Sequence, residues 1–188
     1  VTRSDDAREG GADQPDAQAA LKAARPSYFL LVARKRRRMS DQDRMIELKR
    51  QGFFCSQILM LMALDLQGRE NAPLVRASHA LAGGLGFTGE TCGALTGGAV
   101  VLGMYAGKGK ESDEDDPRLN FMVEDLVKWF KEGYGKDFGG IRCDDILTGV
   151  PNGTATRCPL MVAGTLQKVK DLLIENGFDL GGRDDDDA

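Results

Sequence analysis

The stretch from residue 55 to residue 67 reads CSQILMLMALDLQ, and it decides the class of the fold. Apolar residues fall on nearly every face of a helix drawn through it, and Gly68 follows as a helix stop. A helix that is apolar all round is expected to be buried among other elements of the chain. The stretch therefore predicts an interior helix.

Helical signals continue along the chain from residue 40, and no segment shows the alternation typical of a β-strand. Ser40 and Asp43 form an imperfect capping box, and Asp116 with Pro117 opens another helix by cap and first-turn proline. The segments expected to be helical are 41–51, 55–67, 72–82, 92–106, the segment from Asp116 to Phe130, and the segment from Pro159 to Asn176. The predicted fold is all-α, a compact bundle of about five or six helices.

The fourth of these segments is rich in glycine and alanine. Gly93 and Gly97 lie one turn apart, so one face of that helix lacks side chains. Glycine costs about 0.5–1 kcal/mol relative to alanine in a helix interior. The pattern predicts that another helix approaches closely on this face.

The 188 residues suffice for one domain with a substantial core. Residues 1–38 hold nine basic and five acidic residues, a charge of +4, whereas the whole chain carries −4, so the remainder carries −8. We expect 1–38 to be a disordered extension, with Met39 as the native start. Residues 39–180 are expected to form a four-cysteine helical domain, and 181–188 an acidic, solvated tail.

Charge and hydropathy also bear on partners and compartment. The negative net charge gives no electrostatic footprint for nucleic acid. No apolar run reaches the roughly 18–20 residues needed to span a bilayer. The short apolar patch 29–33 precedes its basic cluster, the reverse of a secretory signal. We therefore expect a cytoplasmic protein with reduced thiols, no membrane partner and no nucleic-acid partner.

Four cysteines carry the most distinctive chemistry, at Cys55, Cys92, Cys143 and Cys158. Their separations of 37, 51 and 15 residues contain no close pair. This excludes a zinc ribbon, a thioredoxin-type motif, a ferredoxin cluster run and c-type haem attachment, all of which need closely spaced cysteines.

Each of these cysteines is expected at the start of a helix or helical turn. Unpaired backbone N–H groups and the positive end of the helix dipole favour a thiolate there, which predicts a lowered thiol pKa and one shared redox or metal site. The alternative is that the cysteines are small buried hydrophobes, since Cys55 shares a stripe with Ile58, Leu59 and Met62.

Residues 89–98, GETCGALTGG, resemble the signature of a family of redox-active proteins. That family is named for one cysteine, then a short Gly-Cys-Ala-x-x-Gly motif, then two more cysteines. Cys92 precedes Gly93 and Ala94 here, whereas the family label places glycine before cysteine. The other three cysteines follow in the family's order, and the resemblance covers about residues 39–180.

The resemblance implies an all-helical domain whose four cysteines act together in redox chemistry, with an iron–sulfur cluster as the expected cofactor. The chain is also similar to the non-haem domain of split-Soret cytochromes, which carries an iron–sulfur centre. It differs from them because it lacks a haem attachment motif and has a single histidine, His79. A redox partner protein is implied without being identified, and formation of a homodimer stays open.

The expected function is one-electron transfer through a cluster bound by Cys55, Cys92, Cys143 and Cys158. One alternative is a thiol–disulfide or small-molecule reductase with Cys92 as the reactive thiol. Another is a non-catalytic protein with a structural zinc bound by the same four cysteines.

Three other features near the cysteines are open to interpretation. His79 is either a ligand or, as we expect, a partly buried structural residue. The segment 83–89 fails the dinucleotide and phosphate-loop patterns, so it is interpreted as a flexible turn that lets backbone approach Cys92. Glu90 is either a proton carrier or, as expected, a solvated loop carboxylate.

Overall fold

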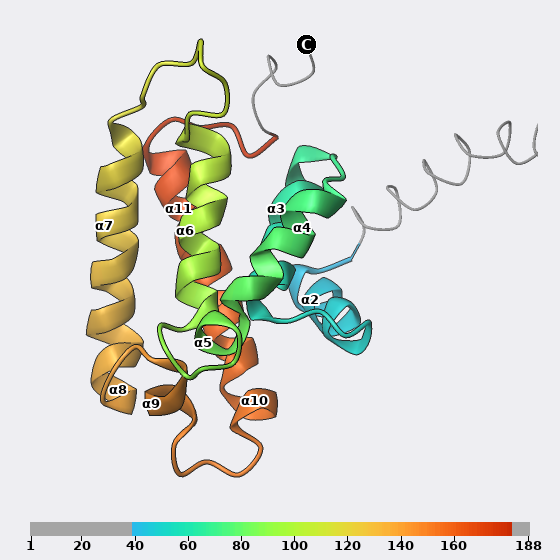
Figure 1. Cartoon of the computed structure of the whole chain (residues 1–188), viewed down its shortest axis with the longest axis vertical. Helices are drawn as coiled ribbons and strands as arrows, with labels where there is room; N and C mark the ends of the chain where they lie inside the picture. Colours follow the sequence, from blue (N-terminus) through green and yellow to red (C-terminus); the bar gives the residue numbers. More distant parts are fainter. Residues whose placement is uncertain (1–38, 182–188) are drawn as a thin grey trace, which may run out of the picture. The chain divides into compact units, whose positions relative to one another are not determined.

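The computed structural model describes residues 39–181 of the chain. In this part, six helices have seven or more residues: α2 (Asp41–Arg50), α3 (Cys55–Gln67), α4 (Ala72–Ser78), α6 (Gly93–Ala106), α7 (Arg118–Phe130) and α11 (Cys158–Glu175) (Figure 1). The shorter elements are the 3₁₀ turn His79–Leu81, α5 (Ala82–Leu85), the π-helical turn Lys131–Gly135, α8 (Lys136–Phe138), α9 (Cys143–Leu147) and α10 (Gly153–Thr156). The all-α prediction is confirmed, because the described residues contain no strand and only one isolated bridge, between Thr91 and Arg142.

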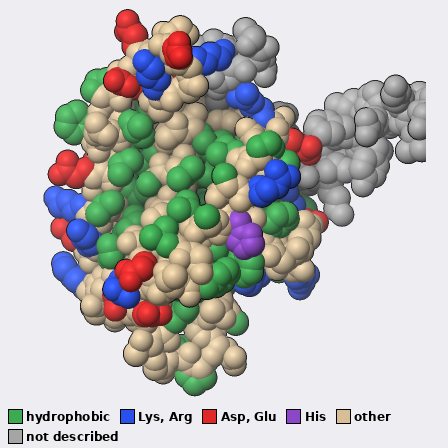
Figure 2. Space-filling view, viewed as in Figure 1, with side chains coloured by type: hydrophobic (Ala, Val, Ile, Leu, Met, Phe, Trp, Pro, Cys, Tyr) green, Lys and Arg blue, Asp and Glu red, His purple; other side chains and the backbone are tan. Residues whose placement is uncertain are grey.

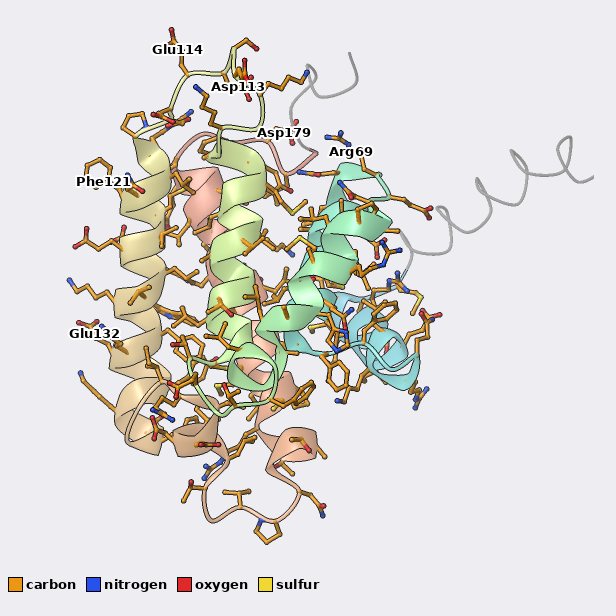
Figure 3. All side chains as sticks on the ribbon, viewed as in Figure 1. Arg69, Asp113, Glu114, Phe121, Glu132 and Asp179 are labelled. Atoms are coloured by element: carbon orange, nitrogen blue, oxygen red, sulfur yellow. The ribbon has the colours of Figure 1, made fainter. Side chains whose placement is uncertain are left out.

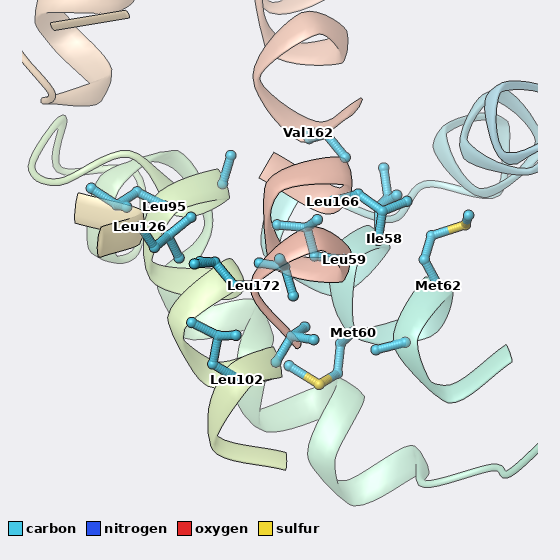
Figure 4. Packing of buried hydrophobic residues seen from close by; sticks show 14 of the residues in the cluster. Ile58, Leu59, Met60, Met62, Leu95, Leu102, Leu126, Val162, Leu166 and Leu172 are labelled. Atoms are coloured by element: carbon cyan, nitrogen blue, oxygen red, sulfur yellow. The ribbon is translucent and has the colours of Figure 1, made fainter. Parts of the chain in front are cut away.

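The core lies where α3 and α6 pack against α7 and α11 (Figures 1 and 4). Leu59 of α3, Leu102 of α6 and Leu126 of α7 are each 0% exposed, and Leu166 and Leu172 of α11 join them. Full burial of such a side chain stabilises the fold by about 1.5–3 kcal/mol. The prediction that residues 55–67 form an interior helix is confirmed.

Two glycine contacts explain why α6 can lie so close to its neighbours. A Cβ on Gly97 would lie 2.9 Å from the Cα of Ser56 in α3, and one on Gly98 would lie 2.6 Å from Cγ2 of Thr165 in α11. Neither distance leaves room for a methyl group. The predicted close approach of another helix on the Gly93 and Gly97 face is therefore confirmed, and the neighbour is α3.

Local capping chemistry sets most helix boundaries as expected. The Ser40 hydroxyl accepts a hydrogen bond from the Asp43 N–H, and the Asn71 side chain accepts one from the Leu74 N–H. The third predicted helix is wrong over its last four residues, because regular α geometry ends at Ser78 and a 3₁₀ turn follows. The glycine pair at 83 and 84 then takes left-handed backbone, which a continuing right-handed helix does not allow.

The two ends of the bundle differ in character. The starts of α6, α9 and α11 gather at the end near α5 and α10 (Figure 1). At the opposite end, Asp113 and Glu114 lie in the loop between α6 and α7 (Figure 3). The cysteine-bearing helix starts are therefore separated from this acidic loop by the length of the helices.

Two predictions concern residues beyond the described range. The disordered extension over 1–38 lies wholly outside it, and the acidic tail 181–188 is described only at Gly181. Among residues 39–181, no helix combines the length and the apolar character that crossing a membrane requires.

Candidate functional site

All four cysteines lie at helix starts, as the sequence analysis predicts. Cys55, Cys143 and Cys158 are the first residues of α3, α9 and α11, and Cys92 is the residue directly before α6. Cys92 is buried and the other three are partly exposed, all with free thiols. The four side chains thus come from four different elements.

Cys92 and Cys143 are joined by a short antiparallel pairing of their backbones. The Cys92 N–H donates to the Ile141 carbonyl at 2.9 Å, and the Cys143 N–H donates to the Glu90 carbonyl at 2.7 Å. The Thr91–Arg142 bridge lies between these two hydrogen bonds. This short pairing therefore fixes how the segments that carry Cys92 and Cys143 lie beside each other, although the two cysteines are 51 residues apart in the sequence.

The segment 83–89 supports this pairing from the other side. Five consecutive residues, 83–87, have positive φ angles, between +59° and +74°. The N–H groups of Gly89 and Glu90 each donate at 3.1 Å, to the carbonyls of Gly83 and Gly84. The predicted turn is present, and it is a hydrogen-bonded left-handed turn that glycine makes accessible.

Two glycines in this turn leave space for the pairing itself. A Cβ on Gly84 would lie 2.4 Å from the Glu90 carbonyl oxygen, and one on Gly89 would lie 2.1 Å from the Asp144 carboxylate. The close approach of backbone toward the cysteine region, which the glycine pattern predicts, is confirmed at Gly84.

Cys55 reaches the same region directly, and Cys158 reaches it through the preceding residue, Arg157. A Cβ on Gly93 would lie 2.7 Å from the Cys55 Sγ, so Cys55 packs on the first turn of α6, beside Cys92. The Arg157 guanidinium donates to the Ile146 carbonyl of α9 and lies 4.4 Å from the centre of the Phe138 ring. Arg157 therefore ties the start of α11 to the helix that begins at Cys143.

The four thiols interact electrostatically as one group. Burial is the largest cause that raises the pKa of Cys92 to about 12; negative charge on Cys55 and Cys143 contributes to this rise, and the N–H groups of Ala94 and Leu95 oppose it. Burial also raises the pKa of Cys158 to about 11, again with contributions from Cys55 and Cys143.

Cys143 follows the same pattern, because burial raises its pKa and negative charge on Cys55 or Asp144 adds to the rise. The prediction of lowered thiol pKa values is wrong for Cys92, Cys143 and Cys158. Loss of hydration and repulsion between neighbouring thiolates outweigh the helix-start N–H groups.

The chemistry of this donor set fits a thiophilic metal or cluster, because four thiolates are the usual ligands of zinc and of iron–sulfur centres. Within residues 39–181, no group of three or more histidine, cysteine, aspartate or glutamate side chains has the geometry of a metal site. In this part of the chain, the four thiols are therefore not set at ligand positions.

The remaining candidates lie around this group. Glu90 is exposed and forms an ion pair with Arg142 at 3.0 Å. The expectation of a partly buried His79 is wrong: the residue is exposed, and its ring stacks on Phe54 at 5.2 Å between centroids.

Three residues near the thiols were not singled out by the sequence. Lys49 lies close enough to Cys158 to oppose the rise in its pKa, and charge on Cys92 contributes to the raised pKa of Tyr134. Arg157 was missed too, although it adjoins a cysteine. Residue type and spacing carry no signal for such contacts, since Lys49 and Tyr134 depend on tertiary packing.

Comparison with known proteins gives one family match. The model of the family described as "Putative redox-active protein (C_GCAxxG_C_C)" matches residues 53–172, a segment that contains all four cysteines. Searches of curated proteins and of solved structures returned no match. Because the family match covers more than half of the sequence, the chain belongs to the C_GCAxxG_C_C family of redox-active proteins.

Proposed function

We propose that this redox-active protein binds an iron–sulfur cluster through Cys55, Cys92, Cys143 and Cys158 and transfers single electrons. The observation that carries the proposal is that four separate helix starts, each with a cysteine, lie against one another. The segments of Cys92 and Cys143 pair through their backbones, the Cys55 Sγ packs on the first turn of α6, and the residue before Cys158 donates to α9. Core filling alone does not require four cysteines to come together at one end of a bundle.

The raised pKa values support a positively charged occupant. Four neighbouring thiolates repel one another, and burial removes the water that would stabilise them. A bound metal centre compensates such charge and deprotonates the coordinating thiols outright. Deprotonation of these thiols is thus unfavourable without a bound cation and becomes favourable when they coordinate one.

The surroundings of Cys92 suit a redox centre as well. The N–H groups of Ala94 and Leu95, in the first turn of α6, act to lower the pKa of Cys92, and N–H groups near the sulfurs, with partial burial, would tune the reduction potential of a bound cluster. When bound, an iron–sulfur cluster would supply a one-electron couple. The chain's own contribution is to provide ligands, orient them and limit access of water.

The reductase alternative is less well supported by the same observations. Burial raises the pKa of Cys92 to about 12, so the fold favours the protonated thiol at pH 7. Reactive cysteines in thiol–disulfide chemistry have lowered pKa values, because the thiolate is the nucleophile. Structural zinc suits the same four thiols, and metal analysis distinguishes it from an iron–sulfur cluster.

The test is anaerobic purification of the full chain, followed by metal analysis, sulfide analysis and a visible spectrum. Iron with acid-labile sulfide and a brown colour is the expected result. Stoichiometric zinc in a colourless protein would favour the structural metal site. A metal-free protein whose free thiols cycle between two and four would contradict the proposal and favour the reductase.

A further inference from the structure

The surface next to Cys55 carries a contiguous set of cationic and aromatic side chains: Lys49, Phe54, His79 and Phe87, here called the aromatic face. The Phe54 ring stacks on His79 and meets the edge of Phe87 at 5.0 Å between centroids. The Lys49 Nζ lies 5.5 Å from the centre of the Phe54 ring. Phe54 directly precedes Cys55, so this face borders the thiols.

At the outer edge of the aromatic face, exposed apolar surface and strained backbone occur at the same residues. Phe87 is 59% exposed and its neighbour Leu85 is 46% exposed, although both side chains are apolar. Both also have left-handed backbone, with φ of +66° and +59°, which costs a non-glycine residue about 1–2 kcal/mol. Local strain and exposed apolar area at one place are typical of a surface that contacts a partner.

A glycine makes this presentation of Phe87 feasible. A Cβ on Gly83 would lie 2.4 Å from Cδ1 of Phe87, so the ring lies directly over the Gly83 backbone. From there its edge reaches Phe54 and His79. The left-handed turn thus serves two purposes, since it supports the pairing near Cys92 and holds Phe87 at the surface.

The charge on this side of the thiols is positive. Among the described residues, no carboxylate forms an ion pair with Lys49. On the other side, the carboxylate of Glu90 is paired with Arg142. Figure 2 shows the single histidine, His79, at the surface beside hydrophobic side chains.

We propose that the aromatic face is the docking surface for a redox partner protein whose contact surface is negatively charged. Lys49 steers the partner by long-range attraction, while Phe54 and Phe87 supply apolar contact next to the thiols. The inference rests on the proposed function, because it assigns the route by which electrons reach the same site.

The first test maps the surface with two redox-inert complex ions whose charges are equal in magnitude and opposite in sign. Hexacyanocobaltate(III) is expected to shift the NMR signals of His79 and Lys49 in the full chain, and hexaamminecobalt(III) is not. Lys49→Gln should abolish the shift at His79, whereas Lys128→Gln, an exposed lysine on α7, should retain it. Equal shifts with the cation, or an unchanged shift in Lys49→Gln, would overturn the proposal.

The second test measures how fast the reduced protein is oxidised by hexacyanoferrate(III). Each such ion accepts one electron, and two thiols that form a disulfide supply two electrons to two ions and release two protons. The rate can therefore be measured with or without bound iron. Lys49→Gln should lower it by about threefold or more at low ionic strength, and high salt should remove the difference from wild type.

The outcomes distinguish this inference from the proposed function. Iron and sulfide in the protein with no effect of Lys49→Gln would sink the docking surface alone. Absence of iron and sulfide, with the effect of Lys49→Gln present, would sink the iron–sulfur proposal alone.

Discussion

Cys92 is the buried cysteine of the four, and burial raises its thiol pKa to about 12. In an unfolded chain a cysteine ionises with a pKa near 9. The folded metal-free protein therefore holds the Cys92 proton through the interval from about pH 9 to about pH 12, where the unfolded chain has lost it. The neutral thiol is thus the form that the fold favours.

This difference predicts how stability changes with pH. Because the unfolded state binds fewer protons above pH 9, the contribution of Cys92 to the free energy of unfolding of the reduced, metal-free protein should be constant below pH 9 and fall above it. The contribution of Cys92 to the slope is about 1.4 kcal/mol per pH unit. Urea unfolding at a series of pH values measures it, and Cys92→Ala should flatten the curve. An equally steep fall in Cys92→Ala would contradict the account.

At the scale of single elements, the left-handed turn over 83–87 tolerates a side chain at some positions and not at others. Gly84 and Gly86 form a matched pair, since both have positive φ but only Gly84 lies against other backbone atoms. The turn supports the pairing that holds Cys92 and Cys143 in register.

Gly84→Ala should therefore destabilise the protein more than Gly86→Ala. We expect a loss of about 1 kcal/mol for Gly86→Ala, from backbone strain alone, and of about 2–4 kcal/mol for Gly84→Ala, where the new methyl group also meets the Glu90 backbone. Chemical unfolding of both variants measures the difference. Equal losses would show that the close approach to Glu90 is unimportant.

Helix α6 offers a second matched pair with effects of opposite sign. Gly97 packs on the Ser56 backbone, whereas a Cβ on Gly103 would meet no atom within 4 Å. Gly103→Ala should stabilise the protein by about 0.5–1 kcal/mol, because alanine loses less backbone entropy in a helix. Gly97→Ala should destabilise it by about 1–3 kcal/mol, through forced separation of α3 and α6. Thermal unfolding compares them, and stabilisation by both variants would refute the packing argument.

The sequence predicts these elements unevenly, and the reason is physical. Helix boundaries follow from local chemistry such as the Ser40 cap, and the placement of Cys55, Cys92, Cys143 and Cys158 at helix starts was predicted correctly. The direction of the shifts in thiol pKa is not predicted correctly, because the burial of the thiols depends on residues that are distant in the sequence.

The left-handed turn was missed for a related reason. Glycines at 83, 84 and 86 permit positive φ, but nothing local requires Leu85 and Phe87 to adopt it. The hydrogen bonds from Gly89 and Glu90 and the contact with Phe54 fix that conformation, and they exist only in the folded chain.

At the scale of the whole molecule, residues from Met39 onward contain the family segment 53–172 and every helix that the core uses. A chain that begins at Met39 should therefore unfold at the same temperature as the full chain, within about 2 °C, and carry the same metal content. Differential scanning calorimetry and metal analysis check both. A clear loss of either would assign residues 1–38 a part in the fold or the site.

The central claim is that four dispersed cysteines form a single cofactor site. Iron and acid-labile sulfide per chain, measured in anaerobically prepared wild type and in each single cysteine-to-serine variant, test it most directly. The account predicts that Cys55→Ser, Cys92→Ser, Cys143→Ser and Cys158→Ser each lower both contents well below wild type while the helical content stays unchanged. Full iron and sulfide in any one folded variant would contradict a shared four-cysteine site.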